Sequence, residues 1–378
     1  MIHPELRRRD FPSLASMTYL NTAAESIPPA CVREALEAYW QDKLRGMNGR
    51  EAHYATMEEC RAPAARLLRL MTTEVSFCSC SAEAYNLLAT ALALKLDDEV
   101  VINDLDFPSG ATPWLSSPSG LKVHVWKSRD GALSLGDLVM MLNERTRLVQ
   151  ASLVSFYNGY RLEWTPFVQA VRQLAPQAII AADVTQALGR IVLDCSDADC
   201  IITSTHKWVL GLHGGCIVGI PRKRAEELTT HAGGWFHLAN AFEPDRFERV
   251  APRSGAASYS VGMPNFAAIY ALNASLRYLE SIGVEKIAAC ADPLVETLHH
   301  GLVELGLKPM APWQGGNCSG IIAFRHSESA AIHAELEREH IHVMHHAGRL
   351  RISVHGYNTP EDAERVLGAL RKMPVLRR

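Results

Sequence analysis

The sequence predicts an α/β protein with a mostly parallel, seven-stranded sheet covered by helices and a smaller C-terminal α+β domain. Two observations lead to this fold class. Between residues 75 and 220, short apolar runs alternate with amphipathic segments, and such alternation is typical of parallel sheets covered on both faces. After Pro252 the pattern changes to long helices and then to a mixture of short strands and helices.

The apolar runs have the length and composition of buried strands. They span residues 75–79, 99–102, 122–126, 148–153, 178–182, 200–203 and 216–219. Helical patterns lie between several of them, at residues 82–95, 133–142 and 165–174. Ligands of such sheets bind at the carboxyl ends of the strands, so a site is expected in the loops that follow these runs.

The C-terminal third has a different organisation. Pro264 suits the start of a helix over residues 265–281, and Gly283 separates it from a second helix that runs to about residue 305. Further strands are expected at 321–324, 341–344 and 350–354, with helices at 330–339 and from 360. We therefore expect an N-terminal segment (1–30) that packs with the small domain, a large ligand-binding domain (31–262), and an interdomain helix with the small domain (263–378).

Composition argues against several classes of protein. The net charge is −3 and the basic runs are short, so neither a nucleic-acid partner nor a membrane partner is expected. No run of about twenty apolar residues is present, and the charged N-terminus lacks the apolar core of a secretory signal. The nine cysteines are scattered and form no Cys-x-x-Cys pair, which is typical of reduced thiols and predicts a cytoplasmic protein.

Lys207 is the first residue that indicates chemistry. It lies within Ser204-Thr205-His206-Lys207-Trp208, a stretch that directly follows the apolar run at 200–203 and comes just before the glycine-rich stretch at 211–215. A lone lysine is normally a solvated surface residue. Small hydroxyls, a histidine and flexible glycines at a strand end instead favour a lysine that reaches a bound ligand.

Two further features lie at the ends of apolar runs. Asp183 follows the run at 178–182, where an unpaired buried carboxylate is unfavourable, so it either caps a helix or faces a heterocyclic nitrogen. Ser81 and Ala82 open the helical segment at 82–95, whose free N–H groups form an anion site, with a simple serine cap as the alternative.

In the order anion site, acid and lysine, these features resemble the fold-type I pyridoxal-phosphate (PLP) enzymes, in particular the class V aminotransferase group. The specific signals are the Asp-x-x-Gln motif at Asp183–Gln186 and the Ser-x-His-Lys motif at Ser204–Lys207. The resemblance extends over nearly the whole chain, to Leu350-Arg351-Ile352-Ser353. It implies a PLP-dependent transferase fold, bound pyridoxal 5'-phosphate, an amino acid-like substrate, and a homodimer with active sites near the interface.

The resemblance also implies roles for individual residues. Lys207 would carry the cofactor as a Schiff base and take the α-proton from the external aldimine, while Asp183 would keep the pyridine nitrogen protonated. Arg351 would clamp the α-carboxylate of the substrate. The remaining cofactor contacts would be Ser81, Ala82, Ser204 and His206 to the phosphate, Gln186 and Asn158 to the ring oxygen, and Phe107 to the ring face. The expected substrate pocket also contains Asn21, Trp235, His345 and His346, and no metal is expected.

The sequence departs from this pattern in three places. Cysteine desulfurases place a nucleophilic cysteine before the carboxylate-binding arginine, but residues 341–350 contain none. Phe107 stands where those enzymes use a histidine, and the two departures together argue against persulfide chemistry. Met263 stands where family members commonly place a threonine that reaches the phosphate across the dimer interface.

The reaction that follows α-proton loss stays open at this point. The first hypothesis is an aminotransferase-like activity, with a C–S lyase or another β- or γ-elimination lyase as the alternative. An amino-acid epimerase and a non-catalytic PLP-binding module are further alternatives. An ordinary nucleotide-binding enzyme is disfavoured, because the chain has no Gly-x-Gly-x-x-Gly after its first strand and no Walker loop.

Overall fold

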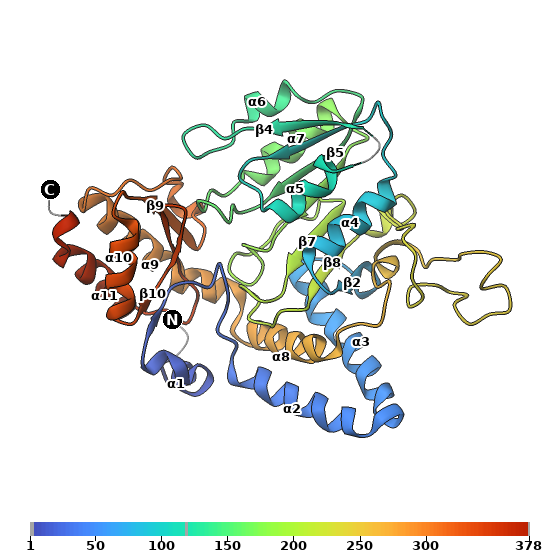
Figure 1. Cartoon of the computed structure of the whole chain (residues 1–378), viewed down its shortest axis with the longest axis horizontal. Coiled ribbons are helices and arrows are strands. Elements are labelled where there is room, and N and C mark those ends of the chain that lie inside the picture. The colour runs from blue at the N-terminus through green and yellow to red at the C-terminus, as the bar shows by residue number, and fades with distance from the viewer. Residues whose placement is uncertain (1–3, 118–119, 377–378) are drawn as a thin grey trace.

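A computed structural model of the chain describes residues 4–117 and 120–376. Its main feature is a seven-stranded sheet of order β2-β8-β7-β6-β5-β3-β4, in which β8 is antiparallel to both of its neighbours and the other strands are parallel to one another (Figure 1). The strands are β2 (Val75–Cys78), β3 (Glu99–Asn103), β4 (Lys122–Trp126), β5 (Thr146–Ser152), β6 (Ile179–Asp183), β7 (Cys200–Ser204) and β8 (Cys216–Gly219). All seven predicted strands are confirmed.

Both faces of this sheet are buried. Along β6, Ile180 and Ala182 belong to one apolar cluster, whereas Ile179 and Ala181 belong to another on the opposite face. This alternation is the period of two that a strand imposes on its side chains. The covering helices between the strands are α4 (Ser81–Leu92), α5 (Pro108–Leu115), α6 (Leu135–Val139) and α7 (Trp164–Leu174).

Three long helices, α2 (Ala30–Leu44), α3 (Arg50–Leu68) and α8 (Phe266–Ile282), pack together below the sheet in the view of Figure 1. Helix α3 was not predicted. Its buried positions include His53, Cys60 and Pro63, and Leu68 is the one leucine, isoleucine or valine among them, so the apolar period that would mark a helix is weak.

The C-terminal part contains a three-stranded antiparallel sheet of order β11-β12-β9, backed by helices. Its elements are α9 (Val284–Glu304), β9 (Ile321–Arg325), α10 (Ser329–Arg338), β10 (Ile341–His342), β11 (Met344–His346), β12 (Arg349–Ser353) and α11 (Pro360–Lys372). The single strand predicted at 341–344 is two strands. β10 pairs with the N-terminal β1 (Thr18–Tyr19), whereas β11 pairs with β12.

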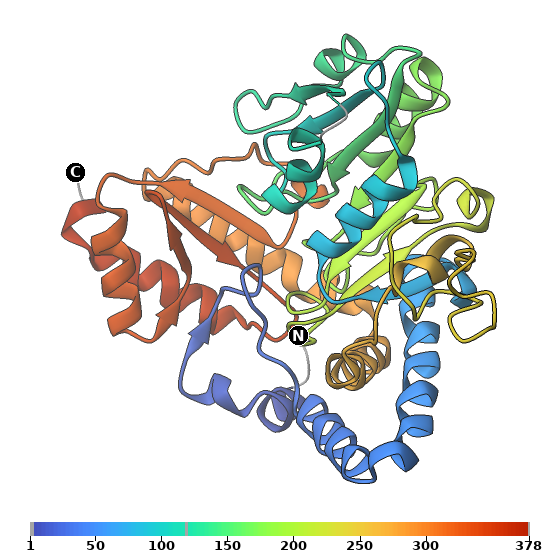
Figure 2. The ribbon, with the colours of Figure 1, turned by 45° about the vertical axis from the view of Figure 1, so that its right-hand side comes forward.

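The N-terminal segment therefore lies against C-terminal elements that are distant in sequence (Figure 2). Asn21 also forms a bridge to Ser353 on β12. The domain boundaries given above stay a prediction. Among the described residues, no helix has the length and apolar character needed to cross a membrane.

Glu99 at the start of β3 provides a test of the sheet. Its carboxylate accepts hydrogen bonds from Asn143 (2.8 Å) and His124 (2.7 Å) and pairs with Arg145 (2.8 Å). The Asn143 hydrogen bond, followed by His124 and the nearby cations, lowers the pKa of Glu99 from 4.5 to about 2. Glu99→Gln should lower the free energy of unfolding by about 1–3 kcal/mol at neutral pH.

Because this pKa is lowered in the folded state, the stabilisation is present above pH 4.5 and is lost as the pH falls through about 2. Denaturant unfolding of both proteins across this range measures the difference. Glu296→Gln is the control, because Glu296 is exposed and makes no hydrogen bond or ion pair with a described residue. A pH-independent deficit in Glu99→Gln would contradict the prediction.

Candidate active site

A cavity of about 780 Å³ opens at the carboxyl ends of β5, β6 and β7. It brings together eight residues that the sequence analysis predicted, namely Ser81, Ala82, Phe107, Asp183, Gln186, Ser204, His206 and Lys207. It also contains residues that were not predicted, including Cys80, Phe156, Thr185 and His213. Parallel strands explain the convergence, since the loops after neighbouring strands emerge at the same edge of the sheet.

Lys207 has the properties of a reactive amine. Burial lowers its pKa from 10.5 to about 8, partly opposed by the nearby Asp183 carboxylate. The Lys207 Nζ lies 5.4 Å from the centre of the Phe107 ring. Within the described ranges, 4–117 and 120–376, Lys207 makes no hydrogen bond or ion pair. A larger fraction of this amine is uncharged near neutral pH than of a solvated lysine, and the uncharged form is the nucleophile.

Asp183 ends β6, and its carboxylate is held on both oxygens. The Tyr85 hydroxyl donates to Oδ2 (2.7 Å) and the Thr185 backbone N–H donates to Oδ1 (2.8 Å). Each carboxylate oxygen can accept a further hydrogen bond, so Asp183 can still face a protonated ring nitrogen in the cavity. Tyr85 was missed by the sequence analysis, although a tyrosine on the buried face of a helix usually needs a partner for its hydroxyl.

The helix α4 presents its N-terminus to the same cavity. Its N-cap residue Cys80 makes no side-chain capping bond, so the first-turn N–H groups near Ser81 and Ala82 can bind an anion. Opposite them, burial lowers the pKa of His206 to about 4. His206 stacks on His213 with ring centres 4.2 Å apart, and a neutral imidazole here can donate a single hydrogen bond to a phosphate.

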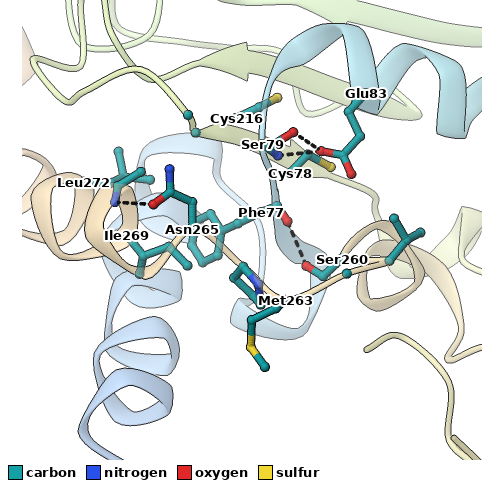
Figure 3. A pocket seen from close by; sticks show the side chains of 16 residues that line it. Phe77, Cys78, Ser79, Glu83, Cys216, Ser260, Met263, Asn265, Ile269 and Leu272 are labelled. Atoms are coloured by element: carbon teal, nitrogen blue, oxygen red, sulfur yellow. Dashed lines mark hydrogen bonds between the residues drawn. The ribbon is translucent and has the colours of Figure 1, made fainter. Parts of the chain in front are cut away.

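A second cavity, of about 460 Å³, adjoins the first across Ser79 and the glycines at 214–215 (Figure 3). Glu83 accepts hydrogen bonds from the Ser79 N–H and hydroxyl, both at 2.6 Å. Met263 is directed away from Ser79. Ser260, a neighbouring residue with a hydroxyl group, donates to the Phe77 carbonyl oxygen at 2.8 Å within the same chain.

The comparisons with known proteins agree with this geometry. The family model described as aminotransferase class-V matches residues 18–366. The chain belongs to the aminotransferase class-V family. Its members are PLP-dependent enzymes of fold type I, so the expected fold and the expected cofactor, pyridoxal 5'-phosphate, are confirmed at the level of the family.

Named relatives cover nearly the whole chain. An uncharacterized aminotransferase, YcbU of Bacillus subtilis, is 27% identical over 95% of each chain. A probable cysteine desulfurase of Pyrococcus abyssi is 26% identical over 98% of this chain and 97% of its own. Among solved structures, apo cysteine desulfurase from Thermococcus onnurineus NA1 has a TM-score of 0.87 at 24% identity, with 97% of each chain covered. The cystine C–S lyase C-DES, in complex with its product cysteine persulfide, has a TM-score of 0.87 at 19% identity, with 96% of this chain and 99% of its own covered.

The argument against a cysteine desulfurase was therefore wrong, because several curated members of the class-V family carry that name. It relied on the missing cysteine at 341–350 and on Phe107. Cleavage of a C–S bond by β-elimination needs an acceptor for the α-proton and a sulfur leaving group, so neither feature excludes it. The structure also places Cys80, the exposed member of the nine cysteines, on the wall of the cavity.

Arg351 lies just behind the cavity. Its Nη1 donates to the carbonyl oxygen of Phe156 (2.7 Å), whose side chain lines the cavity, while its Nε is buried without a partner among the described residues. Burial, together with the charge of Arg349, lowers the pKa of Arg351 to about 9. Asn21 likewise has a buried Oδ1 without a described partner. The Arg351 Nε–H and the Asn21 Oδ1 can therefore each form a hydrogen bond with a polar group of a ligand.

Besides Arg351 and Asn21, four predicted residues do not line this cavity. Asn158 donates to the Gly131 carbonyl oxygen (2.7 Å) and accepts from the Tyr160 N–H (3.0 Å), so its amide is satisfied elsewhere, and Phe156 lies at the cavity instead. His345 pairs with Leu350, so it lies on the face of the small sheet opposite Arg351 and bonds Ser329 (3.1 Å). His346 is exposed, and Trp235 packs on Phe236 and Phe242 away from the cavity lining.

Tyr85→Phe tests the support of Asp183. The variant keeps the ring but removes the donor to a buried carboxylate, so the free energy of unfolding should fall by about 1–3 kcal/mol. Tyr259→Phe is a matched control, because the Tyr259 hydroxyl is equally buried and has no partner among the described residues. Thermal or urea unfolding of the two variants should differ clearly. Equal stabilities would show that the Tyr85 hydroxyl does not stabilise Asp183.

Proposed function

We propose that this class-V family member is a PLP-dependent lyase that cleaves the Cβ–S bond of a sulfur-containing amino acid. The observation that carries the proposal is Lys207, a buried lysine with a lowered pKa and no described hydrogen-bond or ion-pair partner, which shares its cavity with Asp183. The names of the relatives favour sulfur chemistry over transamination, since most of those cited above are desulfurases or C–S lyases.

The residues present fit the cofactor. Bound PLP supplies an electron sink that lets the α-carbon of an amino acid lose its proton. Asp183, whose oxygens accept hydrogen bonds from Tyr85 and Thr185, would face the ring nitrogen and hold a proton on it. The N-terminus of α4 at Ser81 and Ala82 would hold the phosphate, and Phe107 would cover one ring face.

Lys207 has two tasks in this proposal. Its uncharged amine would attach to the cofactor, and once a substrate amine had displaced it, the same amine would take the proton from the substrate α-carbon. Arg351 would orient the substrate through its carboxylate. With that proton removed, the Cβ–S bond of the substrate would break and the sulfur would leave with the bonding electron pair.

The overall reaction balances with water as the only co-reactant. Cysteine and water would give pyruvate, ammonia and hydrogen sulfide, with no oxidant or reductant. A transaminase would instead give the keto acid of the intact substrate and no free ammonia.

A homodimer with the active site near its interface is part of the proposal, and light scattering of the PLP-loaded protein would measure its oligomeric state.

Lys207→Ala tests the assignment. The wild-type protein should bind PLP with a visible absorption band that changes on addition of cysteine or cystine, and it should release sulfide or persulfide together with ammonia and pyruvate. Lys207→Ala should lose turnover by several orders of magnitude, whereas Lys223→Ala, a change at an exposed lysine, should not.

Product analysis separates the alternatives. Formation of the intact keto acid without ammonia would indicate transamination, and inversion at the α-carbon without sulfur release would indicate epimerisation. Either result would overturn the proposed C–S lysis. A band that still changes with amino acids in Lys207→Ala would overturn the role of the lysine.

A further inference from the structure

Three arginines lie on one face of the small C-terminal sheet. Arg349 and Arg351 are two residues apart on β12, so their side chains leave the strand on the same side. Arg325 on β9 is the direct cross-strand partner of Arg349 and shares that side. We call Arg351, Arg349 and Arg325 the arginine strip.

The arginine strip faces the loop that follows β5. Arg351 Nη1 donates to the Phe156 carbonyl oxygen at 2.7 Å, and Arg349 Nη1 donates to the Tyr157 carbonyl oxygen at 2.6 Å. The Arg349 guanidinium also lies 4.2 Å from the centre of the Tyr157 ring. Phe156 lines the cavity beside Lys207, so Arg351, which is bonded to the Phe156 carbonyl, lies directly behind this part of the cavity lining.

The positive charges of the strip are not compensated by carboxylates of the described residues. Within residues 4–117 and 120–376, no carboxylate forms an ion pair with any of the three arginines. Arg349 and Arg351 are 4% and 3% exposed, and the Nε–H of each is buried without a hydrogen-bond partner among the residues that the structure describes. Burial lowers the pKa of both guanidinium groups, and Arg325 lowers that of Arg349 further.

This arrangement is unfavourable unless a ligand completes it. A buried ion is stable when it is paired and its remaining donors are satisfied. Arg349 uses only part of its guanidinium group in the bond to the Tyr157 carbonyl and the contact with the Tyr157 ring. Several further N–H donors of this group remain. A carboxylate would satisfy the remaining donors through the bidentate geometry that arginine favours.

We propose that Arg349 binds a second anionic group of the substrate, next to the α-carboxylate held by Arg351. The proposal rests on the proposed function for the position of the substrate. Positions two residues apart on a strand are separated by roughly 6.5 Å, so the two acid groups would be about that far apart. The substrate class is therefore a sulfur amino acid with a second carboxylate, such as cystine or another cysteine joined through sulfur to an acidic group.

Calorimetry with an unreactive diacid tests this directly. The ligands are adipate and its monoamide, which have the same length and differ in one charge. The PLP-loaded wild-type protein should bind adipate at least about tenfold more tightly than the monoamide, as expected for one charge-assisted bidentate contact. Equal affinities would overturn the proposal, and this measurement does not depend on any variant.

Variants assign the effect to Arg349. Arg349→Gln, which can still donate to the Tyr157 carbonyl, should abolish the preference for adipate while the affinity for the monoamide stays unchanged. Arg325→Gln, at the exposed end of the strip, is the matched control and should keep most of the preference. A preference that survives Arg349→Gln would overturn the proposal, as would an equal loss for both ligands.

Failure here is distinguishable from failure of the proposed function, because calorimetry requires no turnover. An Arg349-dependent preference for adipate in a protein that releases no sulfur would support the second acid site and refute C–S lysis. Sulfur release from cysteine without any preference for adipate would support C–S lysis and refute the second acid site.

Discussion

The site depends on one buried carboxylate. Asp183 ends a central strand, where a charge is tolerated only if its oxygens have donors. Thr185 supplies one donor from the following turn, and Tyr85 supplies the other from α4. The Tyr85 bond also fixes α4 over the end of β6, which brings the N-terminus of that helix to the cavity that contains Lys207. One interaction therefore positions an acid and an anion site together.

A second constraint joins the large sheet to the small one. The loop after β5 approaches β9 so closely that a side chain at Gly159, where φ is +85°, would place its Cβ 2.3 Å from the Ile321 carbonyl oxygen. Only glycine fits this position. The close approach lets Arg351 and Arg349 reach the carbonyl oxygens of that loop. The residues that would activate a substrate, Lys207 and Asp183, therefore come from the large sheet, whereas the arginines that would select it come from the small sheet.

The desulfurase question shows how a missing residue can mislead. The sequence between 341 and 350 lacks a cysteine, yet the first chemical steps of the family do not use one. Residues around Lys207 and Asp183 would govern activation of the amino acid, whereas the identity of the leaving group depends on what lies further along the cavity wall. In the proposal above, the arginine strip behind the Phe156 segment of that wall would distinguish substrates by charge.

The sequence by itself determined the seven strands, because buried strands need continuous apolar runs, and it determined that Asp183 and Lys207 share a site. Asp183 ends β6 and Lys207 lies three residues after the end of β7, so the shared direction of these two strands brings both residues to one edge of the sheet. Tertiary structure decided the rest. Tyr85, Phe156 and Arg349 take part through contacts between segments distant in sequence.

Single-residue differences in direction separate the predicted residues that line the cavity from those that do not. His345 and Arg351 lie on opposite faces of the same small sheet, since strand neighbours alternate. Asn158 is turned toward Gly131 and Tyr160, while Phe156, two residues earlier, lies at the cavity. Local sequence indicates which segments reach the site, but only the packing of those segments decides which side chain of each segment points into it.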